Sequence, residues 1–335
     1  MTADNPNRSQ DCPAGSSQPG CHRREFLGAA AAIPAAMATT QMLGADVPTD
    51  KAKPPDATPM PQISLGKHSI SRLIVGCHNI DGGSHMSRFM DREMRDYYTP
   101  EKAIETLCRC EEVGINAWQG QVRGPLREIY DRHRKTGGKM GLFGLTGRDE
   151  SIQELAKIDG LIALAHHGEV TDRLFKEGKL DVVHDRLKRI RDAGLLVGVS
   201  THMPDVVDAV ESKDWDLDYF QTCVYERHRD EEALEKLLGH VPLPIGEVYL
   251  KSDPPRMFKA IRQSKRPCLA FKILAAGRRS DVEQAFRETF AGIKPTDAAI
   301  VGIYDRYSDQ AGQNAAFVRR FGGPVGVSGT GRIRS

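Results

Sequence analysis

Short apolar runs alternate with amphipathic segments along most of the chain, at a spacing of roughly 30 residues. Short apolar runs bounded by turn residues are typical of buried parallel strands, and apolar positions recurring every three or four residues predict helices packed on those strands. The pattern predicts eight strand–helix units. The strands are expected at 73–77, 115–119, 140–146, 161–167, 195–202, 218–226, 267–277 and 298–305.

Start and stop residues mark several of the intervening helices. Thr99 is placed to cap a helix that begins at Pro100, and Gly114 is placed to end it. The other helices are expected at 125–135, 150–157, 180–194, 204–212, 230–238 and 280–292, with a last one ending near Arg320. These alternating elements predict one α/β domain, a (β/α)8 TIM barrel. A doubly wound sheet is the alternative, but the first turn reads VGCHNIDGG and lacks the GxGxxG pattern.

The first 45 residues have a different character from the rest. Arg23 and Arg24 precede Phe26, Leu27 and an Ala-rich run, which resembles a twin-arginine export signal with small residues near a cleavage site. The apolar run is too short for a permanent membrane span. The resemblance implies a bacterial, periplasmic protein that meets the twin-arginine translocase during export. The alternative is a disordered tail that contains a chance arginine pair.

The expected organisation is a signal at 1–45, a Pro-rich linker at 46–62, a barrel at 63–325 and a tail at 326–335. With 39% hydrophobic and 27% charged residues, the chain has enough apolar sequence for a full core. Its net charge of +2 gives no reason to expect a nucleic-acid partner. The seven cysteines form no disulfide framework or zinc-ribbon spacing.

Barrel chemistry is carried at the carboxyl ends of the strands, where polar residues follow several of the apolar runs. Lys272 lies within an otherwise apolar strand, so an amine that faced the lumen would be desolvated and would act as a base or as a Schiff-base nucleophile. The alternative is a strand-end lysine paired with Glu226. Strand parity does not decide which way Lys272 points. The candidate catalytic residues are Lys272, Glu226, His166 and His167.

Histidines and glutamates from neighbouring strand ends suggest a divalent metal such as Zn, Mn or Fe. The alternative is that one histidine orients the substrate, another caps a loop, and the glutamates pair with nearby arginine or lysine side chains. No short-range ligand motif such as HExxH is present. The candidate metal ligands are His167, His202, Glu226 and Glu247.

A long insert at 78–99 follows the first strand and contains His78 and His85. Long loops on the active face of a barrel often form lids or binding walls, although a surface loop with a short solvated helix is the alternative. Trp118 is a candidate for stacking on a sugar ring, but an aromatic residue there is more often part of the core. The candidate substrate-binding residues are His78, Trp118, Gln119, Arg123, Tyr225, Tyr249 and Asp305.

Several stretches resemble the aldo-keto reductases, a family of barrel oxidoreductases that use NADP(H). The likeness covers MPQISLGKHSISRLIVGCHNIDGG at the start of the barrel, EEVGINAW, GVSTHMPDVVDAV, DYFQTCVYE and VGIY. AFKILAAG and GEVY further resemble a divergent, exported branch of that fold. The resemblance implies the barrel but no specific activity.

The catalytic tetrad of that family is incomplete in this sequence. Gln119 stands near the aspartate position, no tyrosine follows it, and GLFGLTG occupies the place of the lysine strand end. Only the histidine is retained, as His166 or His167. On the cofactor side, Asp305 would repel a phosphate, and Arg306 could compensate.

The interpretation drawn from these features is an exported barrel enzyme acting on a small, carbohydrate-like keto or polyol substrate. Metal-assisted isomerase, epimerase or lyase chemistry is favoured, with Lys272 or Glu226 moving the proton. One alternative is an NADPH-dependent reductase with a rearranged tetrad that uses Tyr225, Tyr249 or Lys272. A further alternative is a barrel that binds a ligand without catalysis.

Overall fold

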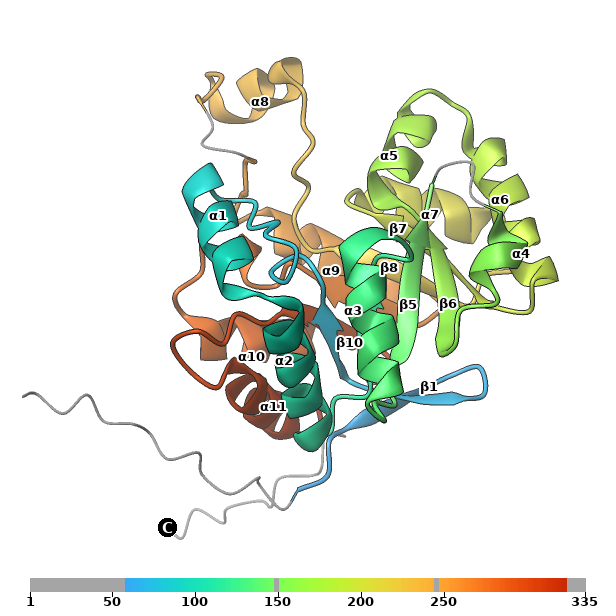
Figure 1. Cartoon of the computed structure of the whole chain (residues 1–335). Helices are drawn as coiled ribbons and strands as arrows, with labels where there is room; N and C mark the ends of the chain where they lie inside the picture. Colours follow the sequence, from blue (N-terminus) through green and yellow to red (C-terminus); the bar gives the residue numbers. More distant parts are fainter. Residues whose placement is uncertain (1–57, 148–150, 244–246, 324–335) are drawn as a thin grey trace, which may run out of the picture. The chain divides into compact units, whose positions relative to one another are not determined.

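The computed structural model describes residues 58–147, 151–243 and 247–323 as a strand barrel surrounded by helices (Figure 1). Eight parallel strands close in the order β10-β3-β4-β5-β6-β7-β8-β9. The predicted (β/α)8 TIM barrel is therefore confirmed. The strands are β3 (Leu73–Gly76), β4 (Ala117–Gly120), β5 (Gly141–Thr146), β6 (Leu161–His166), β7 (Leu196–Thr201), β8 (Tyr219–Cys223), β9 (Cys268–Phe271) and β10 (Ala298–Gly302).

The predicted export signal at 1–45, most of the linker at 46–62 and the tail at 326–335 lie outside the described residues. Export and its translocase partner stay predictions. None of the helices in the described part of the chain is long and apolar enough to cross a membrane. The cysteines of this region, Cys77, Cys108, Cys110, Cys223 and Cys268, are free thiols.

An antiparallel hairpin closes the amino end of the barrel. It consists of β1 (Gln62–Leu65) and β2 (His68–Ser71), which are joined by a tight turn in which Gly66 has a φ of 56°. Ile63, Leu65 and Ile70 belong to the same buried cluster as the inward-facing barrel residues. The hairpin therefore blocks this end, and the opposite, carboxyl end remains for a site.

Alternate strand residues face the lumen and the helices, as the pleat of a strand requires. Tyr219 packs in the lumen cluster against Phe143, with their ring centroids 5.7 Å apart, and the neighbouring Phe220 packs in the outer cluster. The same alternation puts Ala117 inside and Trp118 outside. This parity decides which rim side chains can reach the mouth.

The helices pack around the strands, mostly where the sequence predicts them. Thr99 Oγ1 accepts a hydrogen bond from Lys102 N, and Gly114 has a φ of 89° after the helix, so the predicted cap and stop are confirmed. The helices are α1 (Arg88–Tyr97), α2 (Pro100–Glu112), α3 (Gly124–Lys135), α4 (Ile152–Leu155), α5 (Gly168–Lys176), α6 (Leu180–Asp192), α7 (Pro204–Ser212), α8 (Glu231–Leu238), α9 (Asp253–Gln263), α10 (Val282–Gly292) and α11 (Gln310–Phe321), with a 3-10 turn η1 (Ala275–Gly277).

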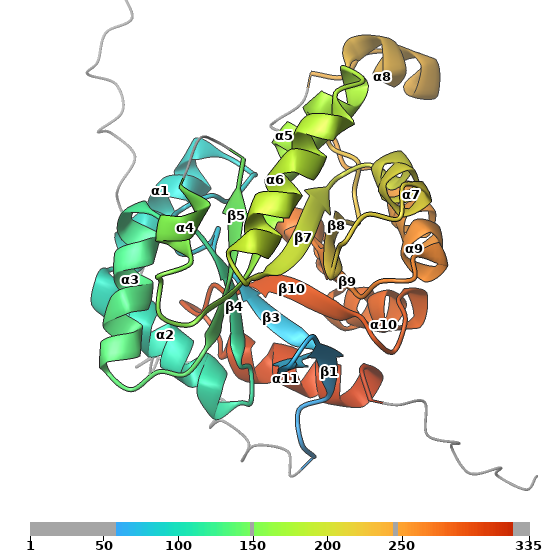
Figure 2. The same cartoon turned by 90° about the vertical axis from the view of Figure 1, so that its right-hand side faces the viewer.

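Two differences from the expected pattern affect the mouth of the barrel. The sequence pattern did not predict α5, which begins directly after β6, or α9, which packs against α7, α10 and β8. The segment 230–238 does form a helix, α8, but Figures 1 and 2 show it standing away from the barrel wall. The wall helix after β8 is therefore α9, and α8 belongs to a long excursion from the mouth.

Arg72 joins the first and last strands of the barrel at the amino end. Its buried guanidinium donates to three main-chain carbonyls, those of Asp297 (2.8 Å), Gly322 (2.6 Å) and Lys294 (2.9 Å). Its own carbonyl accepts from Ala299 N at 2.9 Å. Buried carbonyl groups need donors, so this one side chain satisfies several groups where β3 and β10 meet.

We expect Arg72→Met to lower the free energy of unfolding by at least about 3 kcal/mol, because three carbonyls would lose the guanidinium as a donor and, among the described residues, only that of Lys294 would keep another, Asp297 N. Urea unfolding of the full chain measures this difference. Arg92→Met, at an exposed i,i+4 pair with Asp96, is the control and should change stability by less than about 0.5 kcal/mol. Equal effects of the two substitutions would contradict the role assigned to Arg72.

Candidate functional site

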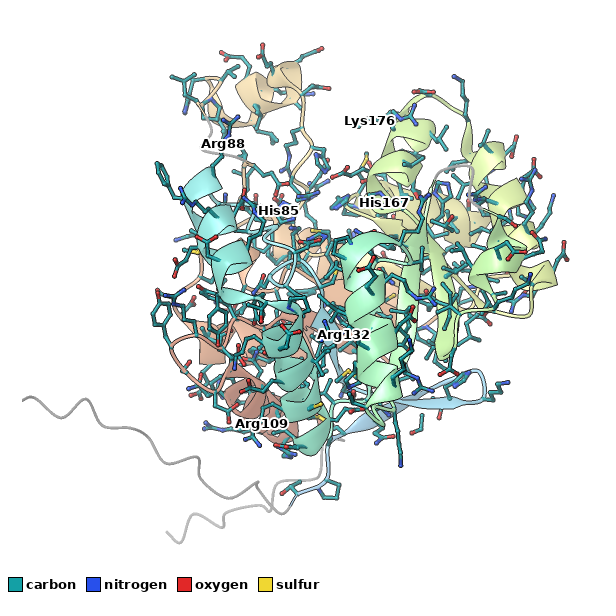
Figure 3. All side chains as sticks on the ribbon, viewed as in Figure 1. His85, Arg88, Arg109, Arg132, His167 and Lys176 are labelled. Carbon is teal, nitrogen blue, oxygen red and sulfur yellow. The ribbon has the colours of Figure 1, made fainter. Side chains whose placement is uncertain are left out.

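Charged and imidazole side chains gather at the carboxyl end of the barrel. They come from the loop after β3, from α5, from the ends of β7 and β9, and from the excursion after β8. Figure 3 shows His85 and His167 at this end, on the segments that follow β3 and β6. This group comprises His78, His85, His167, Glu169, Asp172, His202, Arg227, His228, Glu247, Tyr249, Lys272 and Arg278.

Lys272 directly follows β9 in an unusual backbone conformation. Its φ is 60°, and Ala275 and Ala276 in the next turn have φ values of 50° and 52°. Left-handed conformations are costly for residues other than glycine and persist where the surrounding structure enforces them. The stretch AFKILAAG thus encodes a strained turn that fixes the direction of the lysine.

The amine of Lys272 is half-buried, and it has no hydrogen-bond or ion-pair partner among the described residues. Burial, together with the positive charges of Arg227 and Arg278 and against the raising effects of Cys223 and Glu169, lowers the pKa of Lys272 to about 7. Near neutral pH a substantial fraction of this amine is therefore unprotonated and nucleophilic. Glu226, the pairing partner considered from the sequence, is not bonded to it.

Arg227 organises the carboxylates around this amine. Its buried guanidinium donates to Glu169 Oε1 at 2.9 Å and to Glu247 Oε1. Tyr249 Oη donates to the other oxygen of Glu247 at 2.6 Å. Burial raises the pKa of Tyr249 to about 12, so its hydroxyl is a weak acid at neutral pH. We call Arg227, Glu169, Glu247 and Tyr249 the Arg227 network.

Two histidines of the loop after β3 extend the Arg227 network. His85 Nδ1 lies 3.0 Å from Glu247 Oε1, and His85 Nε2 lies 3.0 Å from His78 Nδ1. Burial first, and then the positive charge of Lys272, lowers the pKa of both imidazoles to about 3. Both rings are therefore neutral at physiological pH.

A second imidazole–carboxylate pair lies on the β6–β7 side of the mouth. His202 Nδ1 lies 2.7 Å from Asp172 Oδ2, and Asp172 also accepts from Thr201 Oγ1 and His202 N. Burial lowers the pKa of His202 to about 4, against the raising effect of Asp172. The ring of His202 packs edge-on against His228 and Phe271. Asp172 thus fixes the ring orientation of His202.

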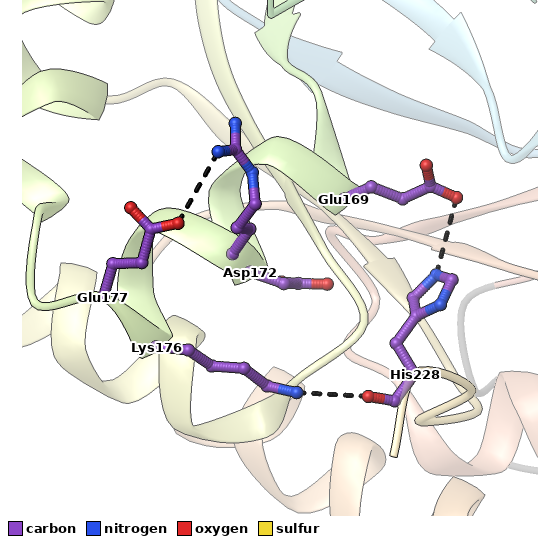
Figure 4. Close-up of a pocket in the computed structure, with 6 residues that line it drawn as sticks. Glu169, Asp172, Lys176, Glu177 and His228 are labelled. Atoms are coloured by element: carbon purple, nitrogen blue, oxygen red, sulfur yellow. Dashed lines mark hydrogen bonds and ion pairs between the residues drawn. The ribbon is translucent and has the colours of Figure 1, made fainter. Parts of the chain in front are cut away.

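A surface hollow of about 440 Å³ lies beside this pair, on the exposed face of α5 (Figure 4). His228 reaches across it: its Nε2 lies 3.5 Å from Glu169 Oε1, and its carbonyl accepts from Lys176 Nζ at 3.1 Å. The hollow lies between α5 and the segment after β8. It is lined by Glu169, Asp172, Arg173, Lys176, Glu177 and His228.

The four predicted metal ligands do not meet at one point. His202 is bonded to Asp172, Glu247 is bonded to Arg227, and Glu226 pairs with Arg229 and Arg256. Across the part of the chain that the structure describes, no group of three or more His, Cys, Asp or Glu side chains is arranged to hold a metal ion. The predicted set His167, His202, Glu226 and Glu247 does not fit a metal, and Glu226 is not brought to Lys272.

Two predicted rim residues face the helix layer and not the lumen. Trp118 is fully buried against Tyr130, with ring centroids 5.8 Å apart, so it does not stack on a ligand and the core alternative holds. His166 is also buried, with Nδ1 2.7 Å from Thr171 Oγ1 on α5. The strand pleat explains both orientations: side chains alternate between the lumen and the helices, and Trp118 and His166 stand at positions that face the helices. Gln119, one residue after Trp118, faces the lumen.

The remaining predicted residues lie at varied distances from the amine. Tyr225 packs against Tyr249 with ring centroids 5.2 Å apart, and Arg123 lies at the start of α3. Asp305 is held on the other side of the rim, where it accepts from Tyr97 (3.1 Å), Tyr98 (3.2 Å) and Thr106 (2.9 Å). Asp305 therefore does not face Lys272.

The charges around the loop after β10 do not suit the phosphate of a cofactor. Arg306, the residue considered to compensate for Asp305, is paired with Glu93 at 3.0 Å. Glu93 also accepts from Tyr304 at 3.2 Å and from Tyr307 at 3.1 Å. Two carboxylates in this loop region would repel a phosphate.

Sequence reasoning missed most of the groups that surround Lys272. Arg278 donates to the carbonyl of His85 at 2.9 Å and lies 4.3 Å from the centre of the Tyr249 ring. Glu169 and Asp172 were missed because α5 was not predicted. The acidic first turn after His167-Gly168 was the available signal for that helix.

Comparisons with known proteins do not assign a family or an activity to this chain. No protein-family model matches the chain, and neither does any curated protein sequence. A glycerol dehydrogenase from Gluconobacter oxydans is a similar solved structure, with 13% identity, a TM-score of 0.40, and coverage of 80% of this chain and 98% of that chain.

Two further solved structures show a likeness of the same order. A 3-deoxy-D-arabino-heptulosonate 7-phosphate synthase from Thermotoga maritima has 13% identity and a TM-score of 0.44, over 78% of this chain and 91% of that chain. An N-acetylneuraminic acid synthetase from Leptospira borgpetersenii has 11% identity and a TM-score of 0.43, over 82% and 95%. At these identities and TM-scores the likenesses assign no chemistry, so the function has to be argued from the site.

Proposed function

We propose that this chain is a barrel enzyme that acts on a small, keto-sugar-like carbonyl compound through a Schiff base with Lys272, as an isomerase or a lyase. The observation that carries the proposal is the amine of Lys272, which is half-buried without a counter-charge beside two arginines. A lysine that is desolvated next to other cations is activated as a nucleophile toward carbonyl groups. The polar mouth suits a hydroxylated substrate.

The chemistry follows from the neutral amine. Lys272 Nζ adds to the carbonyl carbon, and loss of one water leaves a neutral imine. The imine takes up one proton from solvent and becomes the protonated imine. The imine accepts the electron pair of a bond on the adjacent carbon. Loss of a proton from that carbon and its return at a neighbouring position is an isomerisation, whereas cleavage of a carbon–carbon bond is a lyase reaction. The proposal routes no step through a metal, because the predicted ligands do not fit one.

One observation favours a second candidate, the NADPH-dependent reductase with a rearranged tetrad. Tyr249 lies near the same two arginines and the same cysteine as Lys272, and it donates to Glu247. A tyrosine proton donor needs a lowered pKa, however, and burial raises that of Tyr249 to about 12. Oxidation of NADPH by a carbonyl compound would favour this alternative, and saturable binding without turnover would favour a binding protein.

We expect borohydride to trap a covalent adduct on Lys272 when the full chain is incubated at pH 7 with a panel of small keto sugars. With a pKa near 7, the neutral fraction of this amine is roughly a thousandfold larger than that of an ordinary lysine. Intact mass and peptide mapping locate the adduct. Lys272→Arg should abolish trapping, whereas Lys265→Arg, at an exposed lysine before β9, should leave it unchanged. Adducts spread over exposed lysines, and unaffected by Lys272→Arg, would contradict the proposal.

A second expectation concerns stability. The folded pKa of Lys272 lies below its unfolded value of about 10.4, so between pH 7 and 10 the unfolded chain binds more protons than the folded chain. The resulting cost to the free energy of unfolding is complete below pH 7 and declines as the pH rises to 10. Lys272→Met should therefore raise the free energy of unfolding by about 2–4 kcal/mol at pH 6. The gain should shrink as the pH rises through that window. Urea unfolding at several pH values measures it, and a pH-independent loss of stability would contradict the depressed pKa.

A further inference from the structure

We propose that Glu247, His85 and His78 form a proton relay that carries the substrate proton to and from the Schiff base at Lys272. The inference rests on the proposed function for its chemical purpose. It makes His78 the catalytic acid and base, and it makes His85 and Glu247 the groups that position His78 and exchange protons with it. None of these roles depends on a metal.

The hydrogen-bond chain is continuous from the carboxylate to the outer imidazole. Glu247 Oε1 lies 3.0 Å from His85 Nδ1, and His85 Nε2 lies 3.0 Å from His78 Nδ1. His78 Nε2 has no hydrogen-bond partner among the described residues, and its side chain is only half-buried. That nitrogen is therefore the accessible end of the chain.

The reactive amine of Lys272 acts electrostatically on both imidazoles of this chain. Lys272 is the charged group with the largest effect on His78, followed by His85, Arg227 and His167. On the loop that carries His78 and His85, the carboxylate of Asp81 accepts from Gly83 N at 3.0 Å and is not bonded to either imidazole. Cations (Lys272 and Arg227) and carboxylates (Glu247, Glu169 and Asp81) both act on His85, so burial is the main cause that keeps this imidazole neutral.

Neutral rings permit the transfer because each carries one proton and one lone pair. Arg227 Nη1 also lies 3.2 Å from His85 Nδ1, and because a guanidinium only donates, this contact favours the tautomer in which His85 Nδ1 accepts. The receiving arrangement is the other tautomer, in which His85 Nδ1–H donates to Glu247 and His78 Nδ1–H donates to His85 Nε2. His78 Nε2 then takes the proton of the broken carbon–hydrogen bond, and the electron pair moves into the imine. His78 passes its Nδ1 proton to His85, and His85 passes its Nδ1 proton to Glu247, which becomes neutral. The reverse sequence returns the proton to carbon.

The backbone holds the relay in place at a conformational cost. His85 has a φ of 56°, an uncommon conformation for a histidine, and its carbonyl accepts from Arg278 Nη2 at 2.9 Å. Arg278 therefore ties the His85 turn to the segment that follows Lys272. Strained residues that the surroundings hold in this way are frequent at functional sites.

The relay itself is tested by ¹⁵N NMR of the histidine rings in the full chain, without any substrate. We expect His78 and His85 to stay neutral down to about pH 5, with ring tautomers that change together. Glu247→Gln should shift the tautomer populations of His78, although the two residues are not in direct contact. A His78 spectrum unchanged by Glu247→Gln, or rings that titrate near 6.5, would overturn the relay whether or not the Schiff base exists.

The catalytic role is tested by solvent deuterium exchange into the carbonyl compound that the wild type traps with borohydride. His78→Gln should slow exchange at least about 100-fold while borohydride trapping stays within about twofold, and added imidazole should restore part of the rate in His78→Gly. His184→Gln, at a histidine on α6 that stacks on Trp215, is the matched control and should change neither quantity. Parallel losses of trapping and exchange in His78→Gln, or exchange at the wild-type rate, would overturn the role of His78. An absence of trapping in the wild type would instead count against the proposed function.

Discussion

The desolvation of one amine among like charges is the constraint on which the site depends. Lys272 lies beside Arg227 and Arg278 without a carboxylate of its own, so its charged form is destabilised and its pKa falls to about 7. A salt bridge at this position would have had the opposite effect. Glu169, the carboxylate that acts on Lys272, is bonded to Arg227, as is Glu247, and neither forms an ion pair with the lysine.

The other residues at the mouth of the barrel hold Lys272 and the arginines in place. Arg227 is buried, so it needs both of its carboxylate partners, and these come from α5 and from the excursion after β8. The left-handed turn after β9 directs Lys272, and Arg278 links that turn to the loop after β3. The barrel therefore contributes strand ends at fixed positions, and the loops contribute the charges. On the other side of the mouth, the Asp172–His202 pair is also buried. It joins α5 to the end of β7 and does not contain Arg227 or Lys272.

The sequence was sufficient for the barrel but only partly sufficient for the site. Strand spacing predicted all eight barrel strands, because buried parallel strands are short apolar runs that stand out from the amphipathic helices between them. It did not predict the orientation of Lys272, because the residue lies just beyond the last paired position of β9, in a turn that has no strand parity. Trp118 and His166 were assigned to the mouth although their parity turns them to the helices. Partner choice was the other difficulty: nothing local in the sequence shows that Glu247 bonds Arg227 or that His202 bonds Asp172, since these pairs form only when distant segments meet.

The most direct test of the account is the protonation state of Lys272 in the folded chain. Lysine labelled with ¹³C at Cε, followed by NMR from pH 5 to 11, resolves the titration of each amine, and Lys272→Arg identifies the signal by its disappearance. The account predicts one lysine signal with a midpoint near pH 7, well below the others. If the signal lost in Lys272→Arg titrates above pH 10 with the remaining lysines, the amine is an ordinary ammonium ion, and the Schiff-base chemistry proposed for this barrel is wrong.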